Sequence, residues 1–297
     1  MAPVAEFEVR RGRLFGLAYR LLGSAEEAED VVQDAYLRWD RADRAAIEHP
    51  NAWLAKIVTN LCLNRLTAAR TTRERYVGPW LPEPVLTDAL GPLDTVEQRD
   101  SVSFAVLVLL ERLTPAERAV FVLRAAFGYG HREIAEVMDL SEANCRQLYR
   151  RATHHLADRR PRFQPDREQR ERLAARFLAA ASTGDLRGLE AVLADDVTSH
   201  TDGGGHVAAA RRSVVGRDRV ARYLAGGFRK IPDTLDVTFA EVNGGTAVLV
   251  TTAGTLLGVV ALTIEDDRIS ELHVIANPEK LRFVARTLSH SGGLTGS

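Results

Sequence analysis

The side chains best suited to binding chemistry lie on one face of a predicted helix near the middle of the chain. Arg146, Gln147, Arg150 and Arg151 are placed opposite an apolar stripe that begins at Cys145. Arginine can pair bidentately with guanine in the major groove, and further cations can neutralise phosphates. The pattern therefore indicates a helix that binds duplex DNA.

A second polar face lies on the predicted helix that follows Pro50. Lys56, Asn60 and Asn64 recur every fourth residue, which places them on one side of a helix. Arginines follow as far as Arg75. Cations suit phosphates, and amide side chains can bind the edges of unpaired bases. This helix is predicted to contact nucleic acid.

The helix before it has the opposite charge. Between Ser24 and Arg41, the residues Asp30, Gln33 and Asp34 lie away from the apolar face. An acidic surface repels DNA and is complementary to a basic protein partner. The N-terminal part of the chain is thus expected to carry one protein-binding face and one face for nucleic acid.

Two cysteines, Cys62 and Cys145, cannot form a disulfide framework or a four-thiolate zinc site. Both stand in apolar helical patterns, so we interpret them as small core residues. We predict no catalytic residue, no metal site and no cofactor. The alternative is an acid/base set in the C-terminal part. Its members would be His200, Asp202, His206 and His273.

We favour a simpler interpretation of those four residues. The run Asp202-Gly203-Gly204-Gly205 is typical of a turn that requires positive φ. The histidines are then ordinary surface or core residues.

The elements that would position these side chains are helices in the first half of the chain and both helices and strands in the second half. Helical periodicity covers 7–70 and returns at 101–157. Thr114-Pro115 begins one helix, and a short helix over 131–138, a turn and a second helix follow in helix-turn-helix spacing. After about residue 168 the patterns change. Helices are predicted at 168–182, 185–193 and 217–229, and strands near 195–201, 234–242, 246–253, 256–264 and 268–276.

The whole chain of 297 residues has 39 basic and 40 acidic side chains, for a net charge of −1. This excludes a uniformly basic DNA-binding protein, so any charge for DNA must be sorted locally. A hydrophobic content of 45% excludes a mostly disordered chain. The uncharged stretch 242–264 contains several glycines and an Asn243-Gly244 turn, which predicts strands and not a membrane helix. We expect a cytoplasmic protein.

Proline density divides the chain. Four prolines fall within 76–100, and proline cannot continue a helix. Trp80 and Leu81 in this linker offer an apolar anchor for another domain. The expected organisation is a helical domain over 1–75, the linker at 76–100, a helix-turn-helix domain over 101–160, an α+β domain over 166–290 and a flexible tail at 291–297.

Several motifs resemble a known family. AEDVVQDAYLR at 28–38, PNAWLAKIVTNLCLNRL at 50–66 and LTPAERAVFVLRAAFGYGHREIAEVMDLS at 113–141 resemble regions 2 and 4 of extracytoplasmic-function sigma factors, group IV of the sigma-70 family. WLPEP at 80–84, DGGGH at 202–206 and NPEKL at 277–281 resemble the SigJ-type subgroup. That subgroup carries a fused SnoaL-like (nuclear-transport-factor-2-like) domain and usually has Lys in place of His206.

The resemblance implies a fold: two all-α sigma domains, a region 2 helical bundle and a region 4 helix-turn-helix, followed by a cone-shaped α+β SnoaL-like domain. It also implies a role for each face. Asp30, Gln33 and Asp34 would bind the β′ clamp helices of RNA polymerase. Lys56, Asn60 and Asn64 would bind the −10 promoter element, and Arg146, Gln147, Arg150 and Arg151 the −35 element.

A regulatory contact with the fused domain is expected from the linker and subgroup motifs. Some relatives of that domain bind ligands, so a small-molecule ligand there is a further expectation. The contact residues would be Trp80, Leu81, Pro82, Asp202, Gly203, Gly204, Asn277, Pro278 and Lys280.

Two functions fit these patterns. The preferred one is a sigma factor that directs RNA polymerase to specific promoters, helps to melt DNA and is modulated by its fused domain. The alternative is a SnoaL-like sensor or enzyme with a helix-turn-helix, acting as a repressor without polymerase. The acidic helix favours the first, because a simple repressor has no use for it.

Overall fold

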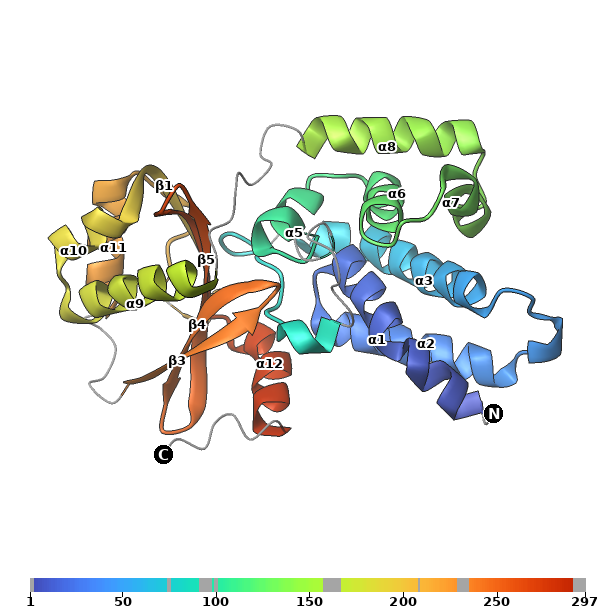
Figure 1. Cartoon of the computed structure of the whole chain (residues 1–297), viewed down its shortest axis with the longest axis horizontal. Helices are drawn as coiled ribbons and strands as arrows, with labels where there is room; N and C mark the ends of the chain where they lie inside the picture. The colour runs from blue at the N-terminus through green and yellow to red at the C-terminus, as the bar shows by residue number, and fades with distance from the viewer. Residues whose placement is uncertain are drawn as a thin grey trace. The chain divides into compact units, whose positions relative to one another are not determined.

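The computed structural model describes residues 3–73, 76–90, 98, 101–156, 167–207, 209–228 and 235–290. The expected flexible tail at 291–297 and most of 91–100 lie outside these ranges. The chain forms two compact units (Figure 1). Unit 1 comprises 1–75 and 87–160, and unit 2 comprises 76–86 and 161–297. The first eleven residues of the expected linker therefore belong with the C-terminal domain.

Unit 1 is helical. Its first half contains α1 (Pro3–Leu22), α2 (Ala25–Arg41), the 3₁₀ turn η1 (Arg44–Ala46) and α3 (Pro50–Arg73). Ser24 caps α2 by accepting a hydrogen bond from the Glu27 N–H, as its position before Glu26 and Glu27 predicts. On the apolar face of α2, Val31, Val32, Ala35 and Trp39 are buried, and Tyr36 is half-buried.

The second half of unit 1 contains η2 (Thr87–Leu90), α5 (Phe104–Leu110), α6 (Pro115–Ala125), α7 (His131–Met138) and α8 (Glu142–Leu156). Thr114 and Glu117 form a capping box at the start of α6, with Pro115 in its first turn. Helices α1 and α3 pack against α6, and α3 also packs against α7. The two predicted helical domains are thus in contact within one unit.

Unit 2 is an α+β domain. Its elements are α9 (Arg167–Thr183), α10 (Leu186–Val192), β1 (Leu193–Asp202), β2 (Val214–Val215), α11 (Arg217–Phe228), β3 (Leu235–Val242), β4 (Gly245–Thr252), β5 (Thr255–Glu265), β6 (Arg268–Ile275) and α12 (Pro278–His290). The strand order is β2-β1-β6-β5-β4-β3, and among these described strands β1 and β6 run parallel while the other neighbours are antiparallel. The uncharged stretch 242–264 forms β4 and most of β5, as predicted.

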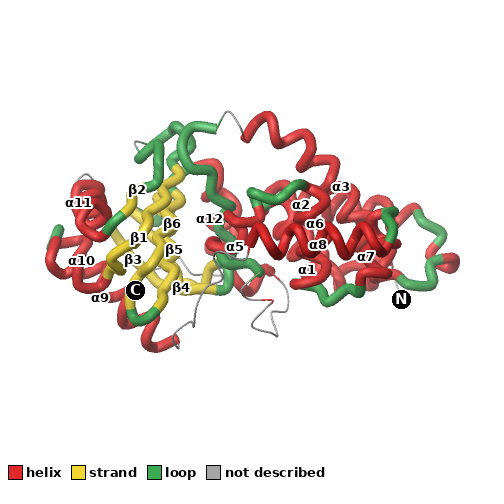
Figure 2. The backbone as a smooth tube through the Cα atoms, turned by 90° about the horizontal axis from the view of Figure 1, so that it is seen from above, coloured by secondary structure: helices red, strands yellow, loops and turns green. Residues whose placement is uncertain are grey.

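Helices cover both faces of the sheet. Residues of α9, α10 and α11 form a core with Val248, Val260 and Leu272 on one face. Side chains alternate along strands, so Ala247, Val259 and His273 point to the other face. Helix α12 contacts β5, and Figure 2 shows it across the strands from α9, α10 and α11. The all-α first half and the α+β C-terminal domain agree with the predicted fold class.

Candidate functional site

Helix α8 presents the predicted DNA-binding face. Cys145, Leu148 and Ala152 are buried on its inner side. On the opposite side, Arg146, Gln147, Arg150 and Arg151 are all exposed, so the structure brings these four together on one surface.

The start of α8 is fixed by local backbone chemistry. Asp139 ends α7 in the left-handed conformation with φ of 54°, and the Asn144 N–H donates to Ser141 Oγ. This short turn joins α7 to α8, which pack against each other as in a helix-turn-helix.

Two arginines of this face also make ion pairs within the unit. Arg146 pairs with Glu142 on the same helix, and Arg151 lies 3.4 Å from Glu117 of α6. Burial raises the pKa of Glu117, but hydrogen bonds from Thr114 and the charge of Arg151 outweigh it and lower the pKa overall. Glu117 therefore both caps α6 and holds α8 against it. Arg150 makes no ion pair in the part of the chain that the structure describes.

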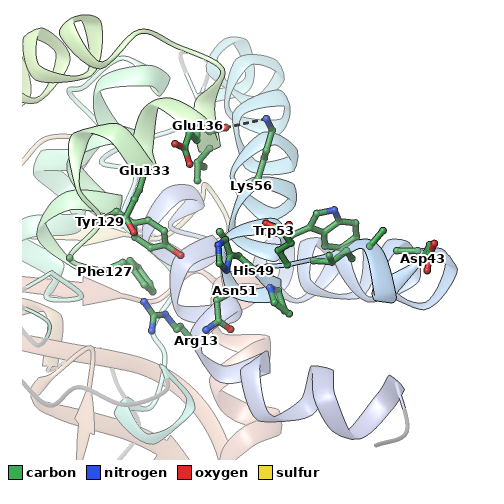
Figure 3. Close-up of a pocket in the computed structure, with 18 residues that line it drawn as sticks. Arg13, Asp43, His49, Asn51, Trp53, Lys56, Phe127, Tyr129, Glu133 and Glu136 are labelled. Carbon is green, nitrogen blue, oxygen red and sulfur yellow. Dashed lines mark hydrogen bonds between the residues drawn. The ribbon is translucent and has the colours of Figure 1, made fainter.

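Helix α3 places Lys56, Asn60 and Asn64 along one side, with Asn64 exposed and the other two half-buried. Lys56 is already engaged. Its ammonium lies 2.5 Å from Asp139 Oδ1 and donates to the Glu136 carbonyl oxygen at 3.1 Å. The predicted nucleic-acid face of α3 therefore contacts the helix-turn-helix directly (Figure 3).

The acidic helix α2 keeps its predicted face at the surface. Asp30 and Gln33 are exposed, and Asp34 is half-buried. Arg65 of α3 lies 3.6 Å from Asp30 and 3.3 Å from Asp34. Because the Asp30 side chain remains 67% exposed, this pairing leaves its carboxylate accessible.

A cavity of about 1110 Å³ lies where the two halves of unit 1 meet (Figure 3). Its walls come from the turn between α2 and α3, the start of α3, and the turn between α6 and α7. They include His49, Trp53 and Tyr129. Sequence reasoning missed this cavity because the two turns carry no periodic pattern and lie about 80 residues apart.

Asp202, at the end of β1, organises the second site. Its fully buried carboxylate accepts four hydrogen bonds. The donors are the Tyr76 hydroxyl (2.6 Å), the Leu81 N–H (2.9 Å), the Gly204 N–H (3.0 Å) and the Lys280 ammonium (2.7 Å). Two of these donors belong to the segment 76–86, which we call the joining segment because it leads from α3 to η2.

Lys280 completes this contact from α12. Its ammonium also donates to the Leu81 carbonyl oxygen and lies 4.1 Å from the ring centroid of Trp80 and 4.7 Å from that of Tyr76. The buried cation is thus held by one carboxylate, one carbonyl and two aromatic faces. Burial and the hydrogen bond to Asp202 raise the pKa of Tyr76, which keeps its hydroxyl a donor.

Two asparagines bind the rest of the joining segment. Asn243 accepts from the Val85 N–H at 3.0 Å and donates its own N–H to the Val85 carbonyl at 2.9 Å. Asn277 Nδ2 donates to the Tyr76 hydroxyl at 2.8 Å. Leu86 then pairs with Val242 at the end of β3. Asn243 and Asn277 are both almost completely buried.

The predicted regulatory residues differ in their placement. Lys280 contacts Trp80, Leu81 and Asp202, Asn277 binds Tyr76, and Pro82 is buried beside Leu81. Gly204 has φ of 59°, and a Cβ there would clash with the Asn277 side chain. A Cβ on Gly203 would clash with the Val207 carbonyl oxygen. Pro278 is exposed and begins α12.

Sequence reasoning missed Tyr76 and Asn243. The only available signal was the Asn243-Gly244 turn, which requires positive φ and gave no hint of a partner at Val85.

The four residues of the alternative acid/base set do not form a single cluster that could transfer protons. Asp202 is occupied by its four donors. His273 is fully buried, and burial together with the nearby His200 lowers its pKa to about 3, so it is neutral at pH 7. The ring of His200 stacks on His273 at 5.2 Å, and its Nδ1 lies 2.7 Å from Ser213 Oγ. His206 is exposed.

The fold defines a helical unit that contains a helix-turn-helix, followed in the chain by an α+β domain. The sigma-70 region 2 family matches residues 7–72, the sigma-70 region 4 family matches 103–156, and the SnoaL-like domain family matches 174–272.

Similar proteins cover nearly the whole chain. The ECF RNA polymerase sigma factor SigJ of Mycobacterium tuberculosis is 38% identical over 93% of this chain and 92% of its own length. A probable ECF RNA polymerase sigma factor SigI of the same species is 35% identical over 93% of this chain and 94% of its own length. The crystal structure of SigJ matches with a TM-score of 0.72 at 36% identity, covering 94% of this chain and 98% of that one.

The chain belongs to the ECF RNA polymerase sigma factors, with a C-terminal SnoaL-like domain of the SigJ kind. It is therefore a transcription initiation factor whose partners are RNA polymerase and promoter DNA. The repressor alternative is not favoured. Within the described ranges, no helix is long and apolar enough to cross a membrane.

Proposed function

We propose that the SnoaL-like domain regulates this sigma factor by holding the joining segment. The observation that carries the proposal is the set of contacts around Asp202 and Lys280. These two side chains, with Asn243 and Asn277, are buried in the C-terminal domain and bind Tyr76, Leu81 and Val85. Buried polar groups are costly unless they are paired, so these four residues favour the bound segment.

Holding this segment limits how regions 2 and 4 can separate. The chain between the end of region 2 near residue 72 and the start of region 4 at 103 contains the joining segment. Eleven of these linking residues, 76–86, are held by the C-terminal domain. The linker of such factors is expected to thread the polymerase cleft, so release of this segment would precede productive binding.

The experiment compares the full chain with a chain that ends at residue 165. Purified core polymerase would transcribe a genomic library with each protein, and promoter affinity would be measured in parallel. We expect higher output from the shorter chain because its linker is free. Equal output together with equal promoter affinity would contradict regulation by the C-terminal domain.

The contacts with polymerase and DNA are assigned to three helices. Asp30, Gln33 and Asp34 on α2 would bind the β′ clamp helices, which suits their exposed acidic face. Lys56, Asn60 and Asn64 on α3 would bind the separated −10 strand. Arg146, Gln147, Arg150 and Arg151 on α8 would bind the −35 duplex. Region 2 would thereby assist melting and region 4 would position the polymerase.

The docking assignment has a matched control on the same helix. Reversing the charges of Asp30 and Asp34 to Lys is expected to abolish binding to core polymerase. Asp40 is an exposed acid of α2 that lies about two helical turns beyond Gln33, outside the predicted set, and Asp40→Lys is expected to leave binding unchanged. Equal affinities for all three proteins would move the docking surface elsewhere.

We also propose that the chain is a non-catalytic subunit that works in the cytoplasm, where its polymerase partner acts. The buried, neutral His273 and the fully occupied Asp202 support this view of the C-terminal domain. A small-molecule ligand of that domain stays a prediction from its fold class.

A further inference from the structure

A second cavity in unit 1 is lined by arginines and has a volume of about 420 Å³. One side is a face of α1 that carries Arg10, Arg13 and Arg20. The other sides come from Asn51 at the start of α3, Leu90 at the end of η2, and the turn after α6. This volume is within the range of small-molecule sites in proteins. The described lining residues are Val9, Arg10, Gly12, Arg13, Arg20, Asn51, Leu90, Gln98, Ala126 and Phe127.

Among the described residues, no carboxylate lines this cavity, although Arg13 also lines the first cavity, whose walls include Glu133 and Glu136. No described lining residue is acidic, and none of Arg10, Arg13 and Arg20 has a described carboxylate within 4 Å. Other arginines of the same unit do have such partners: Arg11 pairs with Glu29, and Arg118 with Glu111. The three cavity arginines therefore form a distinct group.

Arg20 is the most unusual of the three because its side chain is buried. Its guanidinium donates to Ser101 Oγ, the Gly16 carbonyl and the Gln98 carbonyl, all of which are neutral. Only 3% of the residue is exposed. Burying a cation without an anion is costly, and desolvation accordingly lowers the pKa of Arg20 to about 10.

Phe127 and Gly16 fix this geometry. The guanidinium carbons of Arg13 and Arg20 lie 5.6 and 5.3 Å from the ring centroid of Phe127. A Cβ on Gly16 would meet both the Leu90 carbonyl oxygen and the Arg20 guanidinium. Arg10 is oriented by Asn51 Oδ1 at 2.8 Å, which leaves the Asn51 amide NH₂ as a donor. The side chains of Arg10, Arg13 and Asn51 therefore line one cavity together with the buried Arg20.

We propose that this cavity binds a phosphate group, carried either by a small metabolite or by a single-stranded nucleic acid. Planar guanidinium groups hold phosphate oxygens through paired, charge-assisted hydrogen bonds. A phosphate dianion would compensate two of the three cations. Because α1 and the turn after α6 both line the cavity, a bound phosphate would also hold the two halves of unit 1 together. This inference is independent of the joining segment.

Titration calorimetry on the full-length protein tests the proposal, with inorganic pyrophosphate as the probe at constant ionic strength. Wild-type protein is compared with Arg13→Gln, whose side chain is at the surface, and with Arg10→Gln/Arg13→Gln. Arg20 is left unchanged because its replacement could unfold the unit. The matched control is Arg132→Gln on α7, whose side chain is 85% exposed and outside the cavity.

We expect one binding site, weakened about tenfold by Arg13→Gln and further by the double variant, since each loses a charge-assisted pair. Arg132→Gln is expected to match the wild type. Absence of binding at millimolar pyrophosphate, or equal affinity in all four proteins, would overturn the proposal.

Competition with oligothymidylate then separates the two sources of phosphate. Displacement of pyrophosphate supports a phosphodiester of single-stranded nucleic acid as the ligand. Simultaneous binding supports a free phosphorylated metabolite.

Discussion

Lys280 and Asp202 form a buried ion pair, with Nζ 2.7 Å from Oδ2 and less than a tenth of either side chain exposed. One residue comes from α12 and the other from the end of β1. Both also bind Leu81, through its carbonyl oxygen and its N–H respectively. The same ion pair therefore stabilises both the C-terminal domain and the contacts of this domain with the joining segment.

Removing one member of this pair is expected to be strongly destabilising. Lys280→Met would leave the Asp202 carboxylate buried without its cation, at a cost of about 3–5 kcal/mol. Urea unfolding followed by circular dichroism measures this. In the double variant Lys280→Met/Asp202→Asn the loss is expected to be smaller than the sum of the two single losses. Additive losses would mean that the two side chains do not interact in solution.

Arg150 is the strongest candidate for base recognition on α8, because it is exposed and makes no ion pair among the described residues. Arg150→Ala is expected to weaken binding of promoter duplex by about 1–3 kcal/mol, the range for a base-specific arginine. Fluorescence anisotropy against promoter and unrelated duplexes measures it. A loss of the same size on every sequence would assign Arg150 to a phosphate contact.

Freeing Lys56 is expected to strengthen binding of single-stranded DNA. Asp139→Asn removes the anion 2.5 Å from the Lys56 ammonium, and asparagine tolerates the left-handed backbone at this position. This partly exposed pair is worth at most about 1 kcal/mol, so we expect affinity to rise about two- to fivefold. The gain should vanish in Lys56→Met/Asp139→Asn. If the affinity gain persists in this double variant, it does not come from the Lys56 ammonium.

His273 makes stability depend on pH. Its pKa is about 3 in the folded protein and about 6.5 in the unfolded chain, which therefore binds the extra proton between these values. The contribution of His273 to the free energy of unfolding is fully present above about pH 6.5, and it is lost as the pH decreases towards 3. From pH 7.5 to 5.0 the wild type should lose about 2 kcal/mol more unfolding free energy than His273→Gln. Equal losses would mean that His273 is accessible to protons when folded.

Local patterns in the sequence account for most of the fold. The positions of α7 and α8 follow from apolar spacing, and the start of α6 follows from Thr114 and Pro115. Strand alternation and the Asn243-Gly244 turn placed β3 and β4. These features depend on residues within a few positions of one another, so a single sequence is enough to predict them.

Contacts between segments that are far apart in the sequence cannot be predicted in the same way. Asn243 binds Val85, which is 158 positions away, and neither residue carries a periodic signal. Arg10, Arg13 and Arg20 share one helix face, but only the tertiary structure shows that no described carboxylate meets them. The motifs at 80–84, 202–206 and 277–281 carry only a family resemblance, whereas the hydrogen bonds that join them are visible only in the folded chain.

The central claim, that the C-terminal domain restrains the sigma factor by holding the joining segment, is tested most directly by Asn243→Gly. Glycine accepts the φ of 54° at this position, and the change removes the side chain that binds Val85 without altering the segment itself. Hydrogen exchange at 80–86 would verify the release, and transcription by purified core polymerase would measure its effect. We predict several-fold higher output than from wild type. Unchanged or lower output, with the segment demonstrably released, would contradict the account.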